Sequence, residues 1–130
     1  MSHAEGWIQA YGLLEEGKPL TIELRSLVLH NRNGIGESML HWYAIEGAPS
    51  IVEKIISLGF EINDTNKYGE TPLFDCARLG RWEMVGLLLQ HGADPEIRNH
   101  VGDTIFDALE ESDQPEDAEH LRNMTRSIQT

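Results

Sequence analysis

Histidine and cysteine side chains are the groups in this chain that could bind a metal ion or attack a substrate. The six histidines are scattered along the sequence, at His3, His30, His41, His91, His100 and His120. No two of them stand in the His-x-x-x-His spacing of a helical zinc site, and the single cysteine, Cys76, excludes a Cys-x-x-Cys pair. The chain also lacks a Gly-x-Ser-x-Gly turn and a phosphate-binding loop. We therefore expect no catalysis, no metal and no cofactor.

Carboxylates are the most abundant charged groups. The chain has 22 Asp and Glu against 10 Lys and Arg, a net charge of −12. Such a chain repels phosphate backbones and anionic membranes, so we expect neither nucleic-acid nor membrane binding. A protein partner with a basic face is the natural electrostatic complement. The tract from Asp103 to Glu119 holds eight carboxylates and no Lys or Arg. This tract is either a solvated end of the fold or a surface that attracts a basic partner.

The sequence shows no sign of export. A single cysteine cannot form an internal disulfide, which suits a reducing compartment. The segment from Met1 to Leu14 lacks a basic region followed by an apolar stretch, and no run of about 18 apolar residues is present. We expect a cytoplasmic location.

A period of 33 residues organises the elements that carry these groups. Gly36, Gly69 and Gly102 each open a similar phrase: Gly-Glu-Ser-Met-Leu, Gly-Glu-Thr-Pro-Leu and Gly-Asp-Thr-Ile-Phe. The same spacing separates Gly59 from Gly92, and also Asn33, Asn66 and Asn99 from one another. A fixed period in this range indicates stacked supersecondary units.

The middle unit shows its structure most clearly. Residues 66–69 form a predicted turn, after which Thr71 is a predicted N-cap with Pro72 at the first helical position. A stripe of Leu73, Cys76 and Ala77 predicts a buried helix face, where the Cys76 thiol would be inert. Gly80 ends this helix. A second helix follows, with its apolar face at Trp82, Val85, Leu88 and Leu89, and it ends at Gly92.

The two ends of the chain depart from the pattern. Residues 1–32 fit the period poorly, and their apolar spacing predicts a helical pair that caps the array or is itself a degenerate repeat; the alternative is an arm that docks on a partner. Residues 33–65 and 66–98 form two good units. In residues 99–130, Ala118 and Leu121 keep the buried spacing while Asp117 and Arg122 replace apolar residues, as a terminal capping unit requires. These four segments would form one structural domain.

The chain resembles the ankyrin-repeat family over about residues 31–110. The family phrase, Asp-x-x-Gly-x-Thr-Pro-Leu-His-x-Ala-Ala followed by Gly, Val-Val-x-x-Leu-Leu and Gly-Ala-Asp-x-Asn, is followed closely at residues 66–77 and 85–94. Phe74 and Asp107 replace its histidine, so that only His41 remains and some joints between units are expected to be looser. Asp75 stands where an apolar residue is common, and Glu96 replaces the closing Asn.

The resemblance implies an all-α solenoid of helix-turn-helix units with short β-hairpin loops. It also implies protein binding through a concave face built from hairpin tips and first helices. Its variable positions, together with Trp42 on the inner helix face, predict these contact residues: Ile35, Glu37, Trp42, Ile45, Lys67, Tyr68, Glu70, Arg78, Val101 and Asp103. Ile35, Tyr68 and Val101 would form a ladder of tips, unless they pack against neighbouring hairpins. Trp42 is either a contact residue or part of the core.

The small size and the charge are similar to those of bacterial immunity proteins, which neutralise a basic toxin. The alternative is an adaptor or structural subunit of an obligate complex, which leaves its partner active.

Overall fold

The computed structural model describes residues 2–129, and all regular elements in that range are helices. The eight helices are α1 (His3–Glu15), α2 (Ile22–His30), α3 (Met39–Glu46), α4 (Pro49–Ile56), α5 (Pro72–Arg78), α6 (Trp82–Gln90), α7 (Ile105–Glu111) and α8 (Pro115–Gln129). The all-α prediction is therefore confirmed. The loops before α3, α5 and α7 are hairpins, but no residue within 2–129 is in a β-strand.

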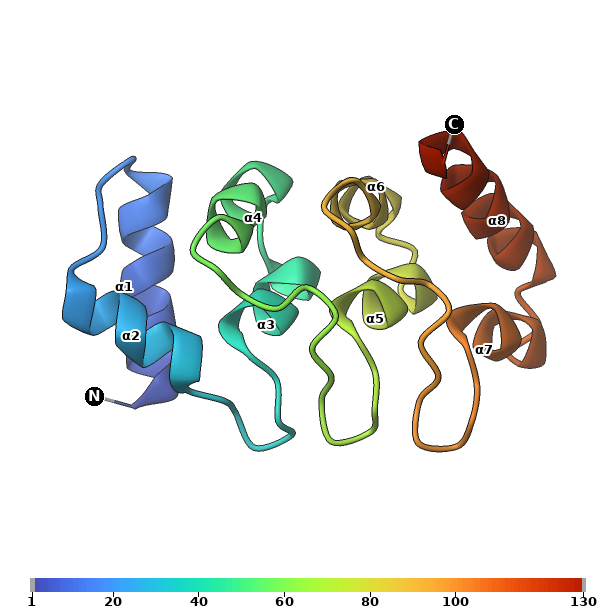
Figure 1. The fold of residues 1–130 in the computed structure, drawn as a ribbon, viewed down its shortest axis with the longest axis horizontal. Coiled ribbons are helices and arrows are strands. Elements are labelled where there is room, and N and C mark those ends of the chain that lie inside the picture. Colours follow the sequence, from blue (N-terminus) through green and yellow to red (C-terminus); the bar gives the residue numbers. More distant parts are fainter. Residues whose placement is uncertain (1, 130) are drawn as a thin grey trace.

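The helices form an elongated array of antiparallel pairs, with three hairpin loops projecting on one side (Figure 1). The first helices of the pairs, α3, α5 and α7, pack in succession, and the second helices, α4, α6 and α8, form a second row on the side away from the hairpin loops. Leu40, Leu73, Val85, Leu88 and Leu121 are among the side chains of one continuous buried core. Each pair thus buries its apolar faces against its neighbours, as a solenoid requires.

The first helices begin at hydroxyl caps, of which the sequence predicts Thr71. The Ser38, Thr71 and Thr104 side chains accept hydrogen bonds from the amides of His41, Phe74 and Asp107, at 3.2–3.3 Å. Pro72 stands at the start of α5, where no amide donor is needed. The cap positions of the three helices therefore repeat at the 33-residue period.

The three hairpins share one hydrogen-bonding pattern, centred on the periodic asparagines. In the middle hairpin, the Asn66 Oδ1 atom accepts from the amides of Tyr68 and Glu70, at 2.9 and 3.1 Å. Asn33 and Asn99 make the same pair of bonds in their own loops. A side-chain oxygen that satisfies two loop amides fixes the turn without a strand partner.

Single backbone hydrogen bonds join adjacent hairpins. The Lys67 amide donates to the Ile35 carbonyl at 2.9 Å, and the His100 amide donates to the Tyr68 carbonyl at 3.0 Å. Gly69 adopts a φ of +77°, and a Cβ atom on it would lie 2.9 Å from the His100 amide nitrogen. The middle hairpin therefore requires glycine for both its conformation and its contact with the next loop. One backbone hydrogen bond between neighbouring hairpins is too few to form a β-sheet.

The N-terminal helices pack on the first repeat. The Tyr11 ring stacks on the Tyr43 ring with centroids 4.3 Å apart, and the Tyr11 hydroxyl accepts from the Ala48 amide at 3.0 Å. From the other side, Lys54 donates to the Leu14 carbonyl at 3.0 Å. These contacts attach the N-terminal helices to the first repeat, and the assignment of residues 1–32 as a cap or a degenerate repeat stays a prediction.

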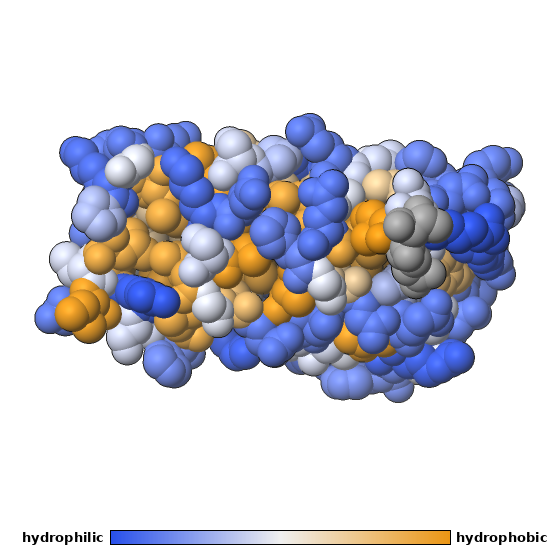
Figure 2. All heavy atoms as spheres, turned by 45° about the horizontal axis from the view of Figure 1, so that its top comes forward, coloured by the Kyte–Doolittle hydropathy of each residue, from blue (hydrophilic) through white to orange (hydrophobic). Residues whose placement is uncertain are grey.

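The C-terminal pair has one buried and one polar side. Ala118 and Leu121 of α8 are fully buried, while Asp117 and Arg122 lie toward solvent, partly exposed. Figure 2 compares the two ends of the array. On the visible face, apolar atoms gather toward the N-terminal end, and the C-terminal end is mostly hydrophilic. Among the described helices, none combines the length and apolar character needed to cross a membrane.

Candidate functional site

The residues predicted to contact a partner fall into three groups by exposure. Trp42, Lys67, Tyr68, Arg78 and Val101 are exposed. Ile35, Ile45 and Asp103 are partly buried. Glu37 and Glu70 are buried and so do not present their carboxylates to solvent.

Three exposed apolar side chains mark the hairpins and α3. Trp42 is 41% exposed, Tyr68 is 50% exposed and Val101 is 80% exposed. Tyr68 and Val101 stand on adjacent hairpin tips, which the bond from His100 to Tyr68 holds together. The Lys67 ammonium lies 5.2 Å from the centre of the Tyr68 ring, within cation–π range. These tips are therefore ordered by local contacts yet open to solvent.

An apolar pocket of about 230 Å³ lies between α1 and α3. Its lining residues are Ala4, Trp7, Ile8, Asn33, Trp42 and Tyr43. Few residues of α1 and α3 touch, because α1 packs mainly on α2 and α4. This face of α3 is therefore less covered than the matching faces of α5 and α7, which explains why Trp42 is exposed. The sequence did not indicate this pocket.

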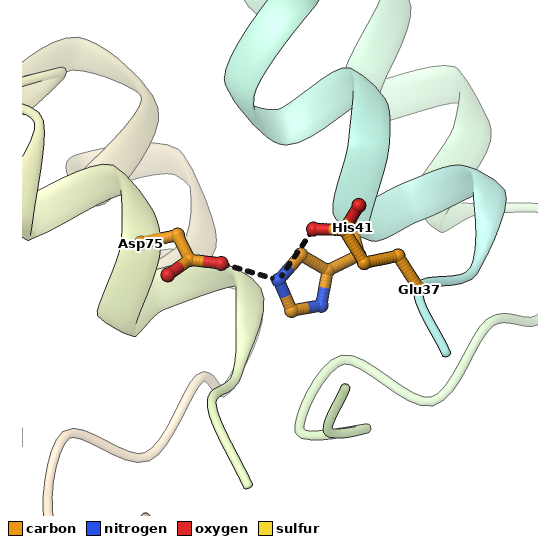
Figure 3. Close-up of side chains that lie close together, drawn as sticks. All are labelled: Glu37, His41 and Asp75. Carbon is orange, nitrogen blue, oxygen red and sulfur yellow. Dashed lines mark hydrogen bonds and ion pairs between the residues drawn. The ribbon is translucent and has the colours of Figure 1, made fainter. Parts of the chain in front are cut away.

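A buried cluster of three ionisable side chains joins the first and second repeats (Figure 3). The His41 Nε2 atom lies 2.7 Å from Asp75 Oδ2 and 3.4 Å from Glu37 Oε2. Glu37 precedes α3, His41 lies in its first turn and Asp75 lies on α5. All three residues are at most 4% exposed. The imidazole thus bridges two carboxylates across the joint between repeats.

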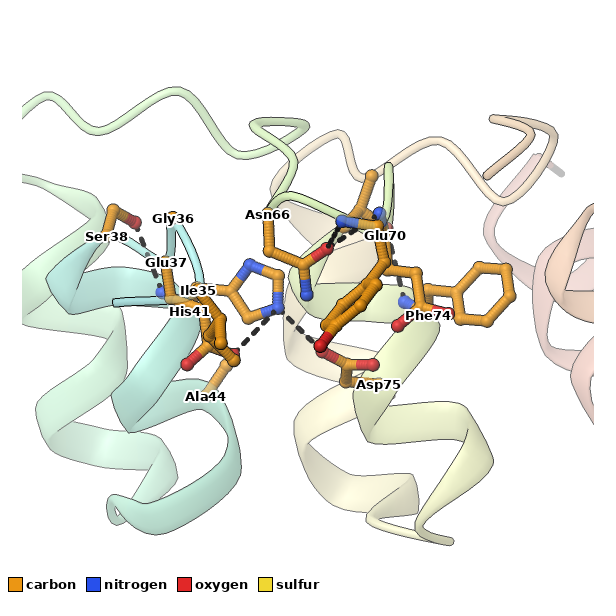
Figure 4. A network of polar contacts seen from close by, with 12 residues as sticks. Ile35, Gly36, Glu37, Ser38, His41, Ala44, Asn66, Glu70, Phe74 and Asp75 are labelled. Atoms are coloured by element: carbon orange, nitrogen blue, oxygen red, sulfur yellow. Dashed lines mark hydrogen bonds and ion pairs between the residues drawn. The ribbon is translucent and has the colours of Figure 1, made fainter. Parts of the chain in front are cut away.

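Figure 4 shows the bridging contacts of His41 within the wider polar network, in which neighbouring donors also hold the outer oxygens of both carboxylates. The Asn33 amide group donates to Glu37 Oε1 at 2.8 Å. The Arg78 guanidinium donates to Asp75 Oδ1 and, at 3.1 Å, to Glu70 Oε2. Glu70 and Arg78 therefore belong to the same network as the bridging imidazole.

Comparison with known proteins identifies the repeat. Residues 14–99, more than half of the chain, match the family described as "Ankyrin repeats (3 copies)". The chain belongs to the ankyrin-repeat family. The match includes part of α1 and all of α2, so this ankyrin region begins before the residues that carry the resemblance in the sequence.

The curated relatives are much longer than this chain. The inactive serine/threonine-protein kinase TEX14 of Bos taurus is 36% identical over 86 residues, which are 66% of this chain and 6% of that protein. The palmitoyltransferase ZDHHC13 of Mus musculus is 38% identical over 93 residues, 71% of this chain and 15% of that protein. Protein phosphatase 1 regulatory subunit 12A of Mus musculus is 33% identical over 76 residues, 58% of this chain and 7% of that protein. The likeness therefore concerns the ankyrin repeats.

Ankyrin repeats are protein–protein interaction modules, and the family is typically non-catalytic. Relatives with enzyme names, such as the palmitoyltransferase, are matched over only 15% of their length. The family finding thus places this chain in a class of binding proteins.

The ankyrin fold also explains why the Cys76 thiol is unreactive. Cys76 is buried on α5, and its thiol donates to the Ala44 carbonyl at 3.2 Å. Burial raises the pKa of the Cys76 thiol to about 12, an effect that the nearby Arg81 charge opposes. The thiol is protonated at neutral pH and shielded from solvent, so it is a core residue and not a nucleophile.

Sequence reasoning missed the surroundings of His41. The sequence gave no reason to group His41 with other ligands, yet the ankyrin fold brings it against Glu37 and Asp75. The spacing of Glu37 and His41, four residues apart, was the available signal. Asp107, at the family histidine position of the last repeat, instead closes the α7 cap, where its bond from the Thr104 amide lowers the pKa of the carboxyl.

Proposed function

We propose that this chain binds a partner protein through its hairpin face. The hairpin face consists of the three hairpin tips and the solvent side of the first helices. Its predicted contact residues are Ile35, Trp42, Ile45, Lys67, Tyr68, Arg78, Val101 and Asp103. The observation that carries the proposal is the exposure of Trp42, Tyr68 and Val101 on ordered elements. Aromatic side chains in such positions are common anchors of protein interfaces.

Order in the hairpins supports binding energetically. The Asn66 side chain fixes the loop that carries Lys67 and Tyr68, and the backbone bond from His100 fixes its neighbour. A loop that is already ordered loses little conformational entropy when a partner docks. More of the interaction energy then appears as affinity.

The buried acidic residues beneath the hairpin face have a supporting role in this proposal. Glu70 and Asp75 hold the Arg78 guanidinium from below, so that this partly exposed cation presents a fixed group at the surface. Asn33 likewise connects the first hairpin to Glu37. Glu37 and Glu70 would shape the hairpin face without touching the partner.

The charge of the chain indicates a basic partner. The net charge is −12, and the carboxylates from Asp103 to Glu119 lie on and around α7 and α8. At that end, a hydrogen bond with Asp103 raises the pKa of Glu111, which shows how closely the acids crowd. A cationic protein approaching this end would relieve their mutual repulsion and associate faster.

The salt dependence of association tests the electrostatic part of the proposal. After affinity capture and mass spectrometry identify the partner, we expect its association rate constant to fall at least about tenfold between about 50 mM and about 500 mM NaCl. The measurement is surface plasmon resonance. The double substitution Asp113→Asn with Glu116→Gln should reduce this dependence, while Glu5→Gln with Glu23→Gln at the other end should leave it unchanged. An association rate constant that does not change with NaCl concentration would contradict a basic partner.

Two forms of the proposal differ in what binding does. In the inhibitor form, the chain acts as an immunity protein that neutralises a basic toxin, and a one-to-one complex abolishes the activity of the target. In the adaptor form, the chain is a subunit of an obligate complex and the partner stays active. An activity assay of the captured partner, with and without the chain, separates the two.

A further inference from the structure

The cluster of Glu37, His41 and Asp75 has the composition of a metal site as well as that of a hydrogen-bonded bridge. One nitrogen and one oxygen from each of two carboxylates lie within 4.8 Å of one another. We propose that these three side chains bind one divalent cation, of the zinc type, in the joint between α3 and α5. This inference does not depend on any protein partner.

The distances from His41 Nε2 to the two carboxylate oxygens can be compared with those around a coordinated ion. Zinc bonds to histidine nitrogen and carboxylate oxygen are about 2.1 Å long, so two ligands of one tetrahedral ion lie about 3.4 Å apart. The Glu37 Oε2 atom already lies 3.4 Å from His41 Nε2. The Asp75 Oδ2 atom, at 2.7 Å from the same nitrogen, must move outward by a fraction of an ångström. That outward shift would bring Asp75 Oδ2 to the same distance from His41 Nε2 as Glu37 Oε2 already has.

The groups behind the ligands are arranged as in a metal centre. Each carboxylate has its outer oxygen occupied by a donor: Asn33 for Glu37, and Arg78 for Asp75. The inner oxygens are left facing the imidazole nitrogen (Figure 3). Such outer contacts fix the orientation of metal ligands and tune their affinity.

The charge balance favours a dication over a proton alone. Glu37, Glu70 and Asp75 are three buried carboxylates, and the guanidinium in their network is that of Arg78. A proton on His41 would neutralise one of the two excess negative charges, whereas a divalent ion would neutralise both. Uncompensated buried charge is costly, so the cation should bind with useful affinity.

The ligand types narrow the class of ion. One imidazole with two carboxylates suits borderline cations such as Zn²⁺ and fits poorly with Ca²⁺, which prefers six or more oxygens. The ligands come from two repeats, with Glu37 and His41 on one side of the joint and Asp75 on the other. Binding would therefore clamp the first repeat to the second and stabilise the stack.

Zinc titration of the untagged full chain, freed of metal with a chelator, tests this inference. We expect calorimetry to show one saturable Zn²⁺ site. At saturating Zn²⁺, the midpoint temperature of thermal unfolding should rise by several degrees, and EDTA should reverse this rise. Glu37→Gln and Asp75→Asn, which keep the side-chain shapes, should each weaken the site at least about tenfold. Glu53→Gln, beside the surface-lying His91, is the matched control and should bind as the wild type does.

The wild-type result decides the matter even if a variant fails to fold. Absence of a saturable one-equivalent site in the wild type would overturn the proposal and leave the cluster as a hydrogen-bonded bridge. Undiminished zinc affinity in a folded Glu37→Gln or Asp75→Asn variant would overturn it as well, since the ion would then bind elsewhere.

Discussion

Leu88→Ala is expected to lower the free energy of unfolding by about 2–5 kcal/mol. Leu88 lies on α6 and is fully buried, in a core shared by the repeats on both sides. Truncation removes apolar contacts and leaves a cavity that the short, closely packed helices can only partly fill. Because each repeat is stabilised by its neighbours, the loss should lower the cooperativity of the whole array.

Urea denaturation followed by circular dichroism measures this effect. Leu79→Ala is the matched control, since Leu79 stands just past α5 and is 58% exposed. Its effect should stay within about 0.5 kcal/mol, as for most surface substitutions. Equal effects of the two substitutions would contradict the packing described for α6.

His41→Ala is expected to destabilise the metal-free protein by about 3–5 kcal/mol. The imidazole contacts Asp75 at 2.7 Å and Glu37 at 3.4 Å, and its removal leaves two buried carboxylates facing one another across the joint. Both carboxylates keep one donor, from Arg78 and Asn33, but lose the group between them. The penalty therefore comes mainly from uncompensated charge and not from lost apolar area.

His91→Ala provides the comparison in the same denaturation experiment. The His91 side chain is 34% exposed and lies 3.8 Å from the exposed Glu53 carboxylate, so its loss should change stability by less than about 0.5 kcal/mol. If His41→Ala were equally mild, the cluster would not be the tie between α3 and α5 that the contacts indicate.

The sequence predicts the repeated elements well because each depends on nearby residues. Thr71 and Pro72 start α5 as expected, and Leu73 and Cys76 are buried at helical spacing. Asn66 fixes its hairpin through bonds to residues two and four positions later. Caps, stripes and turns of this kind require no knowledge of the neighbouring repeat.

The site was harder to predict because it depends on contacts between repeats. Asp75 is the counterpart of Trp42 by period, yet the former is buried and the latter is exposed. The difference arises because α3 covers Asp75 from one side, whereas α1 leaves the matching face of α3 open. Glu37 was expected at the surface for a similar reason: its position in the hairpin was visible in the sequence, but His41 and Asp75 around it were not.

The two proposals concern different parts of the same joint, the hairpin tips for partner binding and the buried cluster for stability. The hairpin tips carry Tyr68 outward for a partner, and the cluster beneath them holds the first and second repeats together. Arg78 links the two levels, because its guanidinium contacts buried Asp75 and reaches the solvent side. A change in the cluster would therefore alter the presentation of the hairpin face.

The most direct test of the central claim is the affinity of Tyr68→Ala for the identified partner, measured by isothermal titration calorimetry. Ile22→Ala serves as the control, since Ile22 is 85% exposed on α2, outside the hairpin face. The account predicts that Tyr68→Ala weakens binding by at least about 2 kcal/mol, roughly thirtyfold in Kd, and that Ile22→Ala binds as the wild type does. Unchanged affinity of a folded Tyr68→Ala variant, or a loss confined to Ile22→Ala, would contradict binding through the hairpin face.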